Sequence, residues 1–361
     1  MAETVELWER KVGELEHLDS SRWDALDDSL ISYLKLSSAK TATMLSSPYA
    51  SEDATAQIIG VMGGAVIGGM CIHPMQVIAD GKTYAIVSAS NTLVAESRRD
   101  TCLGADFYRM LPSLSPDGIS IRSGISRKGY LMCKAVRHTI FCFTDFLYIR
   151  RSRHCLFKWY KRMLAPFADM VFWLQRVVCN IVVRKRLKRF AVREVPHDDE
   201  LLRHLAALVA KDSHRFRENI SEEWLKWVMA NDFFDVGKAG KRIYGVYDMD
   251  GSLVGFCMAK IACDWRSAMI VEWQFAEDFE WMEPWVLLDV SRQISKEVEV
   301  VRMRVSSKEC LHEYGRLHLF RNGEQYAVIG TTKQSPLRKH EGYKEVSNWR
   351  LRPGMADVPF Y

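Results

Sequence analysis

The first part of the chain alternates between the apolar spacing of a helix and that of a strand. Apolar residues recur every three or four positions over residues 7–36, which predicts a long helix there. Two apolar runs follow at 57–62 and 65–72, and the Gly63-Gly64 pair between them suits the positive φ angles of a tight hairpin turn. Pro74 has no amide proton to donate to a ladder, so we expect it to end the second of these strands.

The remaining apolar runs predict a similar succession of elements in each half of the chain. In the first half we expect strands at 83–94, 119–121 and 139–149, and helices at 103–111 and 127–136. In the second half we expect helices at 200–210, 222–230 and 284–296, and strands at 243–247, 253–261, 269–275, 298–305, 325–329 and 345–351. The predicted fold class is therefore α+β, with two domains that each hold a mostly antiparallel mixed sheet flanked by helices.

The distribution of charge divides these two domains. The net charge is +5, yet residues 150–193 hold thirteen Lys or Arg side chains and a single acid, Asp169. That segment carries +12, so the rest of the chain sums to −7. We predict a first domain over residues 1–150, a basic amphipathic linker helix over 151–193, and a second domain over 194–361.

The basic segment has three interpretations. We favour a brace that packs its apolar face between the two domains. Its charge also suits a peripheral contact with an anionic membrane. Nucleic acid is not an expected partner, because no reading module accompanies the basic residues. A membrane span is not expected, because polar residues interrupt the apolar stretch. These are Asp169, Gln175, Arg176 and Asn180.

The spacing of the cysteines and histidines argues against disulfide and metal sites. Nine cysteines show no C-x-x-C spacing, and their odd number argues against a disulfide framework. The acidic start has no basic and apolar signal segment, so a cytoplasmic location is expected. None of the ten histidines has the spacing of a zinc site, and no metal is expected. Hydrophobic residues make up 48% of the chain, which excludes global disorder.

The segment that points to chemistry runs from residue 91 to residue 108. It reads as a strand end, a short polar loop with Arg98 and Arg99, and a helix that begins near Gly104. Free amides at a helix N-terminus and the helix dipole favour an anion, and a glycine lets a phosphate approach the backbone closely. Two arginines add charge-assisted contacts. The pattern predicts a phosphate-binding loop.

This loop resembles the coenzyme A pyrophosphate motif of the GNAT acyltransferase superfamily, Arg/Gln-x-x-Gly-x-Gly/Ala. Arg99 stands first and Gly104 last, while Cys102 stands where the middle glycine is usual. The resemblance implies that acetyl-CoA or another acyl-CoA is the co-substrate. It also implies a set of coenzyme-binding residues: Leu93, Val94, Arg98, Arg99, Asp100, Thr101, Cys102, Leu103, Gly104 and Ala105.

The same resemblance implies a tandem GNAT protein with a degenerate second domain. The later family motif is similar to residues 123–137, where Cys133 stands nearest to the tyrosine that often serves as general acid. The implied function is transfer of an acyl group to an amine or hydroxyl acceptor, a sugar or an amine, bound between the domains. Glu272 and Glu277 are candidate bases on the acidic second half. The alternative is a non-catalytic GNAT-like binding protein, which Cys102 and the missing tyrosine favour.

Overall fold

The computed structural model describes residues 5–15, 38–99, 102–125, 127–152, 164–231, 240–262 and 266–353. The first half contains β1 (Glu6–Lys11), α2 (Ser38–Leu45), β2 (Thr55–Met62), β3 (Ala65–Ala79), β4 (Lys82–Val94), α3 (Leu103–Met110), β5 (Ile119–Ile125), α4 (Arg127–Ala135) and β6 (Thr139–Ile149). The second half contains α6 (Ala165–Arg186), β7 (Ala191–Val195), α7 (Asp199–Ala210), β8 (Phe216–Glu218), α8 (Glu222–Ala230), β9 (Lys241–Tyr247), β10 (Leu253–Ile261), β11 (Ser267–Phe275), α9 (Glu283–Gln293), β12 (Val300–Val305), α10 (Lys308–Arg316), β13 (Phe320–Thr331) and β14 (Trp349–Arg350).

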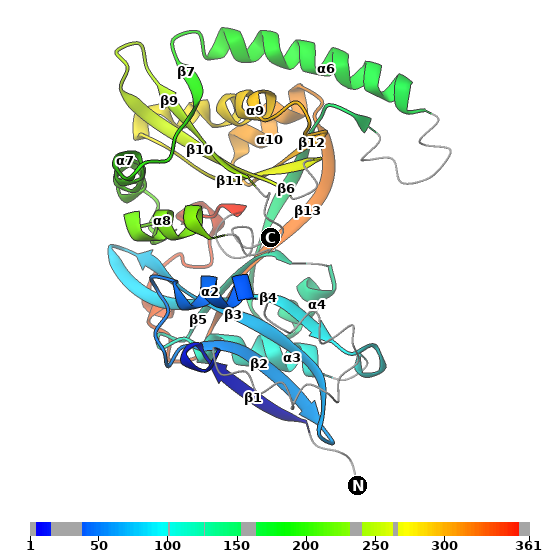
Figure 1. Cartoon of the computed structure of the whole chain (residues 1–361), viewed down its shortest axis with the longest axis vertical. Coiled ribbons are helices and arrows are strands. Elements are labelled where there is room, and N and C mark those ends of the chain that lie inside the picture. Colours follow the sequence, from blue (N-terminus) through cyan, green and yellow to red (C-terminus); the bar gives the residue numbers. More distant parts are fainter. Residues whose placement is uncertain are drawn as a thin grey trace.

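One mixed sheet runs through both halves of the described chain. Its main path is β1-β2-β3-β4-β5-β13-β6-β12-β11-β10-β9-β7, with β8 and β14 attached at β3. Helices flank each end of the sheet (Figure 1). Most neighbouring strands are antiparallel, while β4–β5 and β11–β12 are parallel. The α+β class and the mixed sheet flanked by helices are confirmed.

The order of strands in space departs from their order along the chain at the middle of the sheet. β13, near the C-terminus, lies between β5 and β6, and β6 in turn pairs with β12. Each half therefore supplies a strand that pairs with strands of the other half. The division of the chain at residues 150 and 193 stays a prediction.

Most of the strands and helices predicted from the apolar pattern are confirmed within a few residues, but three predictions are wrong. The strand expected at 345–351 is reduced to β14, because residues 346–348 form a 3-10 turn. Residues 6–11 form the strand β1 and not a helix, because they pair along β2 at the edge of the sheet. Pro74 does not end a strand, because β3 continues to Ala79. On one edge β3 stays paired with β4 through Pro74, which lies opposite Val87. On the other edge the pairing of β3 with β2 stops at Cys71 and its pairing with β8 begins at Val77, so Pro74 lies in a gap where no amide is needed. Residues 16–37 of the predicted first helix lie outside the described part.

The brace interpretation of the basic segment is also wrong. Figure 1 shows α6 along the outer side of the second half, far from the first-half strands β1 to β4. It packs mainly on α9, and it donates hydrogen bonds to carbonyl groups at the end of β6 and after α10. By length and composition, α6 is also apolar enough to cross a membrane, and only 11% of its most apolar window is buried.

Candidate active site

The C-terminal end of β4 carries a β-bulge. Cys71 of β3 pairs with Ser90 and Gly69 pairs with Leu93, so β4 uses three steps where β3 uses two. A bulge leaves backbone groups outside the regular ladder and bends the strand. Gly68 makes this close crossing possible, because a Cβ there would lie 2.6 Å from the carbonyl oxygen of Leu93. The residues of β4 that this register leaves without a partner are 91 and 92, directly before Leu93 and Val94, which pair with Gly69 and Gly68.

The ladder between β4 and β5 stops close to this bulge. The two strands are parallel, and their register holds a single pair, Val87 with Ser120. Two residues further along β5, the buried Arg122 side chain bridges the strands instead, donating from Nε to the carbonyl oxygen of Ala89 at 2.9 Å. Its guanidinium lies over the Tyr108 ring of α3, 4.6 Å from the ring centroid. The sheet thus opens between β4 and β5, and α3 lies over the opening.

The N-terminal turn of α3 lies beside the end of β4 and the opening between β4 and β5. Cys102 is the N-cap in αR conformation, φ −76°, and its side chain makes no capping hydrogen bond. The first internal hydrogen bond runs from the Asp106 amide to the Cys102 carbonyl at 2.9 Å, so the amides of Gly104 and Ala105 belong to the turn that has no acceptor within the helix. A Cβ on Gly104 would lie 3.0 Å from the Met132 sulfur of α4 and 3.9 Å from Val94. Strand end, helix start and α4 therefore meet at Gly104.

Comparisons with known proteins agree with this geometry. No protein-family model matches the sequence, and no curated protein matches it significantly. Solved structures do match. Saccharomyces cerevisiae N-myristoyltransferase, solved with bound myristoyl-CoA, has a TM-score of 0.55 at 11% identity, over 92% of this chain and 80% of that one. An Enterococcus faecalis protein of unknown function, described as a probable N-acyltransferase, has a TM-score of 0.53 at 10% identity, over 92% and 73%. The chain shares the fold of these two proteins.

Within this fold, the predicted coenzyme residues do not all have the same surroundings. Leu93, Val94, Gly104 and Ala105 lie around the bulge and the helix start. Leu103 also lies there, but its side chain is buried in the core against Gly60 and Phe107. Asp100 and Thr101 lie outside the described residues.

The two predicted arginines sit on the loop before α3. Arg98 ends a short 3-10 turn and is half-buried, while Arg99 is exposed and its Nη1 lies 3.2 Å from Glu96. An exposed pair of this kind is weak, about 0–1 kcal/mol. Arg99 can therefore exchange Glu96 for a stronger anion at little cost.

Cys133, which stands nearest to the family's general acid, is fully buried on α4. It packs with Tyr108, Ile125 and Val328. Burial raises the pKa of its thiol to about 11, against the opposing charge of Arg122. The thiol thus stays protonated at neutral pH, enclosed in the core beside the opening in the sheet. Arg122 was not predicted from sequence, since an isolated arginine within an apolar strand gives no family signal.

The second half repeats the bulge in another setting. On β11, Glu272 pairs with Met258 and Ile270 with Ala259, so this strand also carries an extra residue. The helix that follows, α9, is buried throughout residues 283–291, and Pro284 lies in its first turn. Glu277 is exposed on the acidic 3-10 turn before it.

Glu272 is not placed as a free base. Its carboxylate accepts from Arg350, and Arg350 Nε also donates to Gln274 at 2.7 Å and lies 3.3 Å from Asp212. All four side chains are buried. Burial works against the charge of Asp212, but the His214 hydrogen bond and Arg350 hold its pKa below the usual range. Arg350 therefore ties the C-terminal segment to β11.

Glu218, at the end of β8, is the buried acid that sequence reasoning missed. Both of its carboxylate oxygens lack a hydrogen-bond partner among the described residues. Burial and the neighbouring Glu272 raise its pKa well above the ordinary value. Because β8 pairs with β3 and β14, this acid lies where the first-half sheet, the C-terminal segment and β11 come together.

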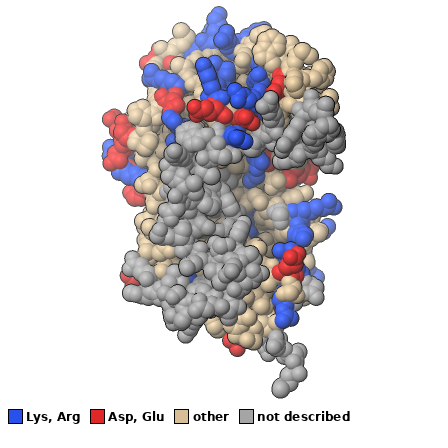
Figure 2. Space-filling view, turned by 45° about the vertical axis from the view of Figure 1, so that its right-hand side comes forward, with Lys and Arg blue, Asp and Glu red and all other residues tan. Residues whose placement is uncertain are grey.

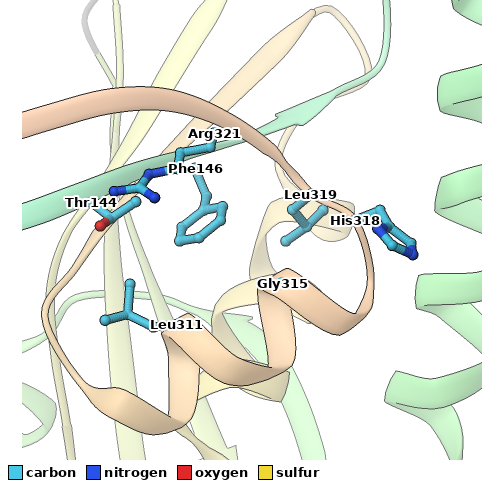
Figure 3. Close-up of a pocket in the computed structure, with 7 residues that line it drawn as sticks. All are labelled: Thr144, Phe146, Leu311, Gly315, His318, Leu319 and Arg321. Atoms are coloured by element: carbon cyan, nitrogen blue, oxygen red, sulfur yellow. The ribbon is translucent and has the colours of Figure 1, made fainter.

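Two surface cavities in the described structure lie away from the predicted loop. One of about 490 Å³ opens between β6, the end of α10 and the start of β13, with Phe146 and Leu319 on its wall and Arg321 at its edge (Figure 3). Another of about 840 Å³ lies between α4 and β13 and is lined by Tyr130, Leu131 and Tyr326. No group of three metal-ligating side chains occurs among the described residues.

Proposed function

We propose that the protein is an acyltransferase that takes its acyl group from acyl-coenzyme A. The observation that carries this proposal is the meeting of the β4 bulge, the opening between β4 and β5, and the first turn of α3. The likeness to N-myristoyltransferase, which was solved with myristoyl-CoA, supports an acyl-CoA as the donor. Both acetyl-CoA and a longer acyl-CoA are compatible with these features.

In this proposal the coenzyme pyrophosphate binds at the start of α3. The amides of Gly104 and Ala105 donate to phosphate oxygens, and the helix dipole adds favourable charge. Arg98 and Arg99 approach from the loop and neutralise the phosphates. The Met132 side chain covers the Gly104 surface, so it must turn aside when coenzyme binds. Methionine is well suited to this movement because its side chain is flexible.

The chemical step is direct attack of the acceptor on the thioester carbonyl. The acceptor nitrogen or oxygen forms a bond to the carbonyl carbon, the C–S bond breaks, and the coenzyme leaves as a thiolate that takes up a proton. Backbone amides close to the bulge, near Leu93 and Val94, donate to the oxyanion that forms during attack. The protein contributes mainly by holding the two reactants in position.

We place the acceptor between the two halves, on the side of the C-terminal segment. The buried groups there include three carboxyls, Asp212, Glu218 and Glu272, for the single guanidinium of Arg350. Even with Glu218 protonated, Asp212 and Glu272 outnumber the guanidinium of Arg350, and their negative charge favours an amine acceptor over the hydroxyl of a neutral sugar.

Calorimetry and a thiol-release assay test the proposal. The full chain is titrated with acetyl-CoA and with myristoyl-CoA, and release of free coenzyme is then followed with a panel of amines and sugars. We expect saturable binding and acceptor-dependent release of thiol. Binding without turnover for any acceptor would support the non-catalytic alternative. Absence of binding to both acyl-CoA forms would refute the proposal.

A further inference from the structure

The helix α6 turns its polar side chains toward the protein and its apolar side chains toward the outside. Asp169 accepts a hydrogen bond from the Ser152 amide at 2.5 Å. Gln175 donates to the Leu317 and His318 carbonyls, and Arg176 donates to the Ile149 and Arg150 carbonyls at 2.8 and 3.0 Å. A surface helix of a water-soluble protein has the opposite arrangement, with its apolar stripe on the core.

The outward face is large and apolar. Its side chains are between 36% and 65% exposed: Phe167, Met170, Val171, Trp173, Leu174, Val177, Val178 and Ile181. On the inner side of α6, only Ala165, Cys179 and Val183 are buried. Contiguous apolar surface of this kind is rare on a monomeric soluble protein and marks an interaction site.

Two more exposed aromatic rings lie near α6 and the residues that follow it. The ring of Phe320, 45% exposed, lies 6.5 Å from the Phe172 ring. Near the other end, Phe190 contacts Trp281, which is 47% exposed. We call the eight exposed apolar side chains of α6, from Phe167 to Ile181, the apolar face.

Basic residues accompany the apolar face. The last turn of α6 and the residues after it carry five exposed cations: Arg184, Lys185, Arg186, Lys188 and Arg189. At the top of Figure 2, the end where Figure 1 places α6, Lys and Arg side chains lie beside uncharged surface. The one acid of the segment, Asp169, is turned inward. An apolar surface beside cations matches the interface of an anionic bilayer.

We propose that α6 lies in the plane of an anionic membrane, with its apolar face among the lipid acyl chains and its basic end at the headgroups. The hydrogen bonds from Asp169, Gln175 and Arg176 fasten the helix along the folded body, so it cannot cross the bilayer while they persist. Such a surface would hold the protein at a membrane whether or not it transfers acyl groups.

Vesicle co-sedimentation of the full chain tests this inference. One set of vesicles contains phosphatidylcholine alone, and the other contains phosphatidylcholine and phosphatidylglycerol in equal parts. We expect stronger binding to the mixed vesicles, weakened by salt because the electrostatic part is screened. Substituting Arg184→Gln and Lys185→Gln together should lower affinity for mixed vesicles by about fivefold per charge and leave the weaker binding to phosphatidylcholine nearly unchanged.

Two matched leucine substitutions show whether membrane binding depends on the apolar face of α6 or on exposed apolar side chains in general. Leu174 on α6 is 52% exposed and Leu131 on α4 is 57% exposed, so Leu174→Glu and Leu131→Glu make the same change in two exposed helices. We expect Leu174→Glu to weaken binding to mixed vesicles about tenfold or more and Leu131→Glu to leave it unchanged. Circular dichroism confirms that both variants fold.

Four results would overturn the proposal. The first is no binding to mixed vesicles at low salt, and the second is an equal loss in the two leucine variants. The third is a dimer in analytical ultracentrifugation that Leu174→Glu dissociates, with no vesicle binding, which would make a second copy of the chain the partner. Extraction of the protein only by detergent, at any salt concentration, would indicate a membrane span instead.

Discussion

Each half of the molecule has a bulged strand followed by a helix, but the residues around the start of that helix differ between the halves. In the first half, β4 leads through a loop with Arg98 and Arg99 to Gly104, where a Cβ would lie nearest to the flexible end of Met132 and, further off, to Val94. In the second half, β11 leads through an acidic turn to α9, which is buried and has Pro284 in its first turn. In our proposal the same backbone arrangement binds an anion in the first half and serves as core in the second, so the surroundings of the helix start decide which of the two it does.

The largest expected effect concerns the buried arginine of the second half. Arg350→Leu should lower the free energy of unfolding by about 3–5 kcal/mol, because it leaves Asp212 and Glu272 buried without their cation. Urea unfolding measures this loss. The control is Arg99→Leu in the first half, whose exposed pair with Glu96 should cost no more than about 1 kcal/mol. Equal losses would mean that the two arginines do not differ as described.

Gly104→Val should weaken coenzyme binding by about tenfold or more, or about 1.4 kcal/mol, because the new side chain occupies the surface proposed for phosphate. The fold should survive, since the nearest atoms belong to the flexible end of Met132. Gly315→Val on α10 is the matched control, because a Cβ there meets nothing within 4 Å. Titration calorimetry with acyl-CoA gives both affinities. Unchanged affinity in a folded Gly104 variant would place the phosphate elsewhere.

Glu218 makes stability depend on pH in a direction that can be stated. Its pKa is higher in the folded chain than the ordinary value of 4.5. Above that pH the unfolded chain releases this proton while the folded chain keeps it, so the contribution of Glu218 to stability falls as pH rises. Glu218→Gln should remove this fall, and the variant should gain on the wild type between pH 5 and 8, as urea unfolding at several pH values would show. If the free energies of unfolding of the variant and the wild type changed with pH in parallel, Glu218 would not be the buried acid described.

Cys102→Gly should have the smallest effect. Cys102 has a φ of −76°, which any residue adopts, so the middle glycine of the family motif is not required by backbone geometry here. We expect coenzyme affinity to change less than about twofold. Labelling of the exposed Cys102 thiol in the wild type should be slowed by bound coenzyme. A large loss of affinity in the glycine variant would show that the cysteine side chain itself contacts the ligand.

Local signals in the sequence were sufficient to predict most helices and strands, and to predict where the loop between β4 and α3 lies. Gly63 and Gly64 have φ angles of +58° and +81°, as the predicted hairpin requires, and the helix predicted at Leu103 begins there. The errors have nonlocal causes. An apolar helical period also fits residues 6–11, and only the pairing with β2 decides that they form a strand.

The orientation of α6 and the chemistry of the second half could not be predicted for the same reason. Periodicity shows that a helix has an apolar face, but it does not show whether that face meets protein or lipid. The inward turn of Asp169 and Gln175 depends on carbonyls from distant segments. The pairing of Arg350 with Glu272 joins residues far apart in sequence, and no spacing rule predicts it.

The exchange of strands at the centre of the sheet has a consequence for how the protein is made. While the ribosome synthesises the chain, β5 and β6 emerge long before β13, which completes the sheet between them. Until then, each of these strands presents unpaired amides and carbonyls, which can pair with other chains. Pairing over such a long sequence separation is slow. We therefore expect the nascent first half to need protection by chaperones, and its expression alone to yield aggregates because β13 is missing.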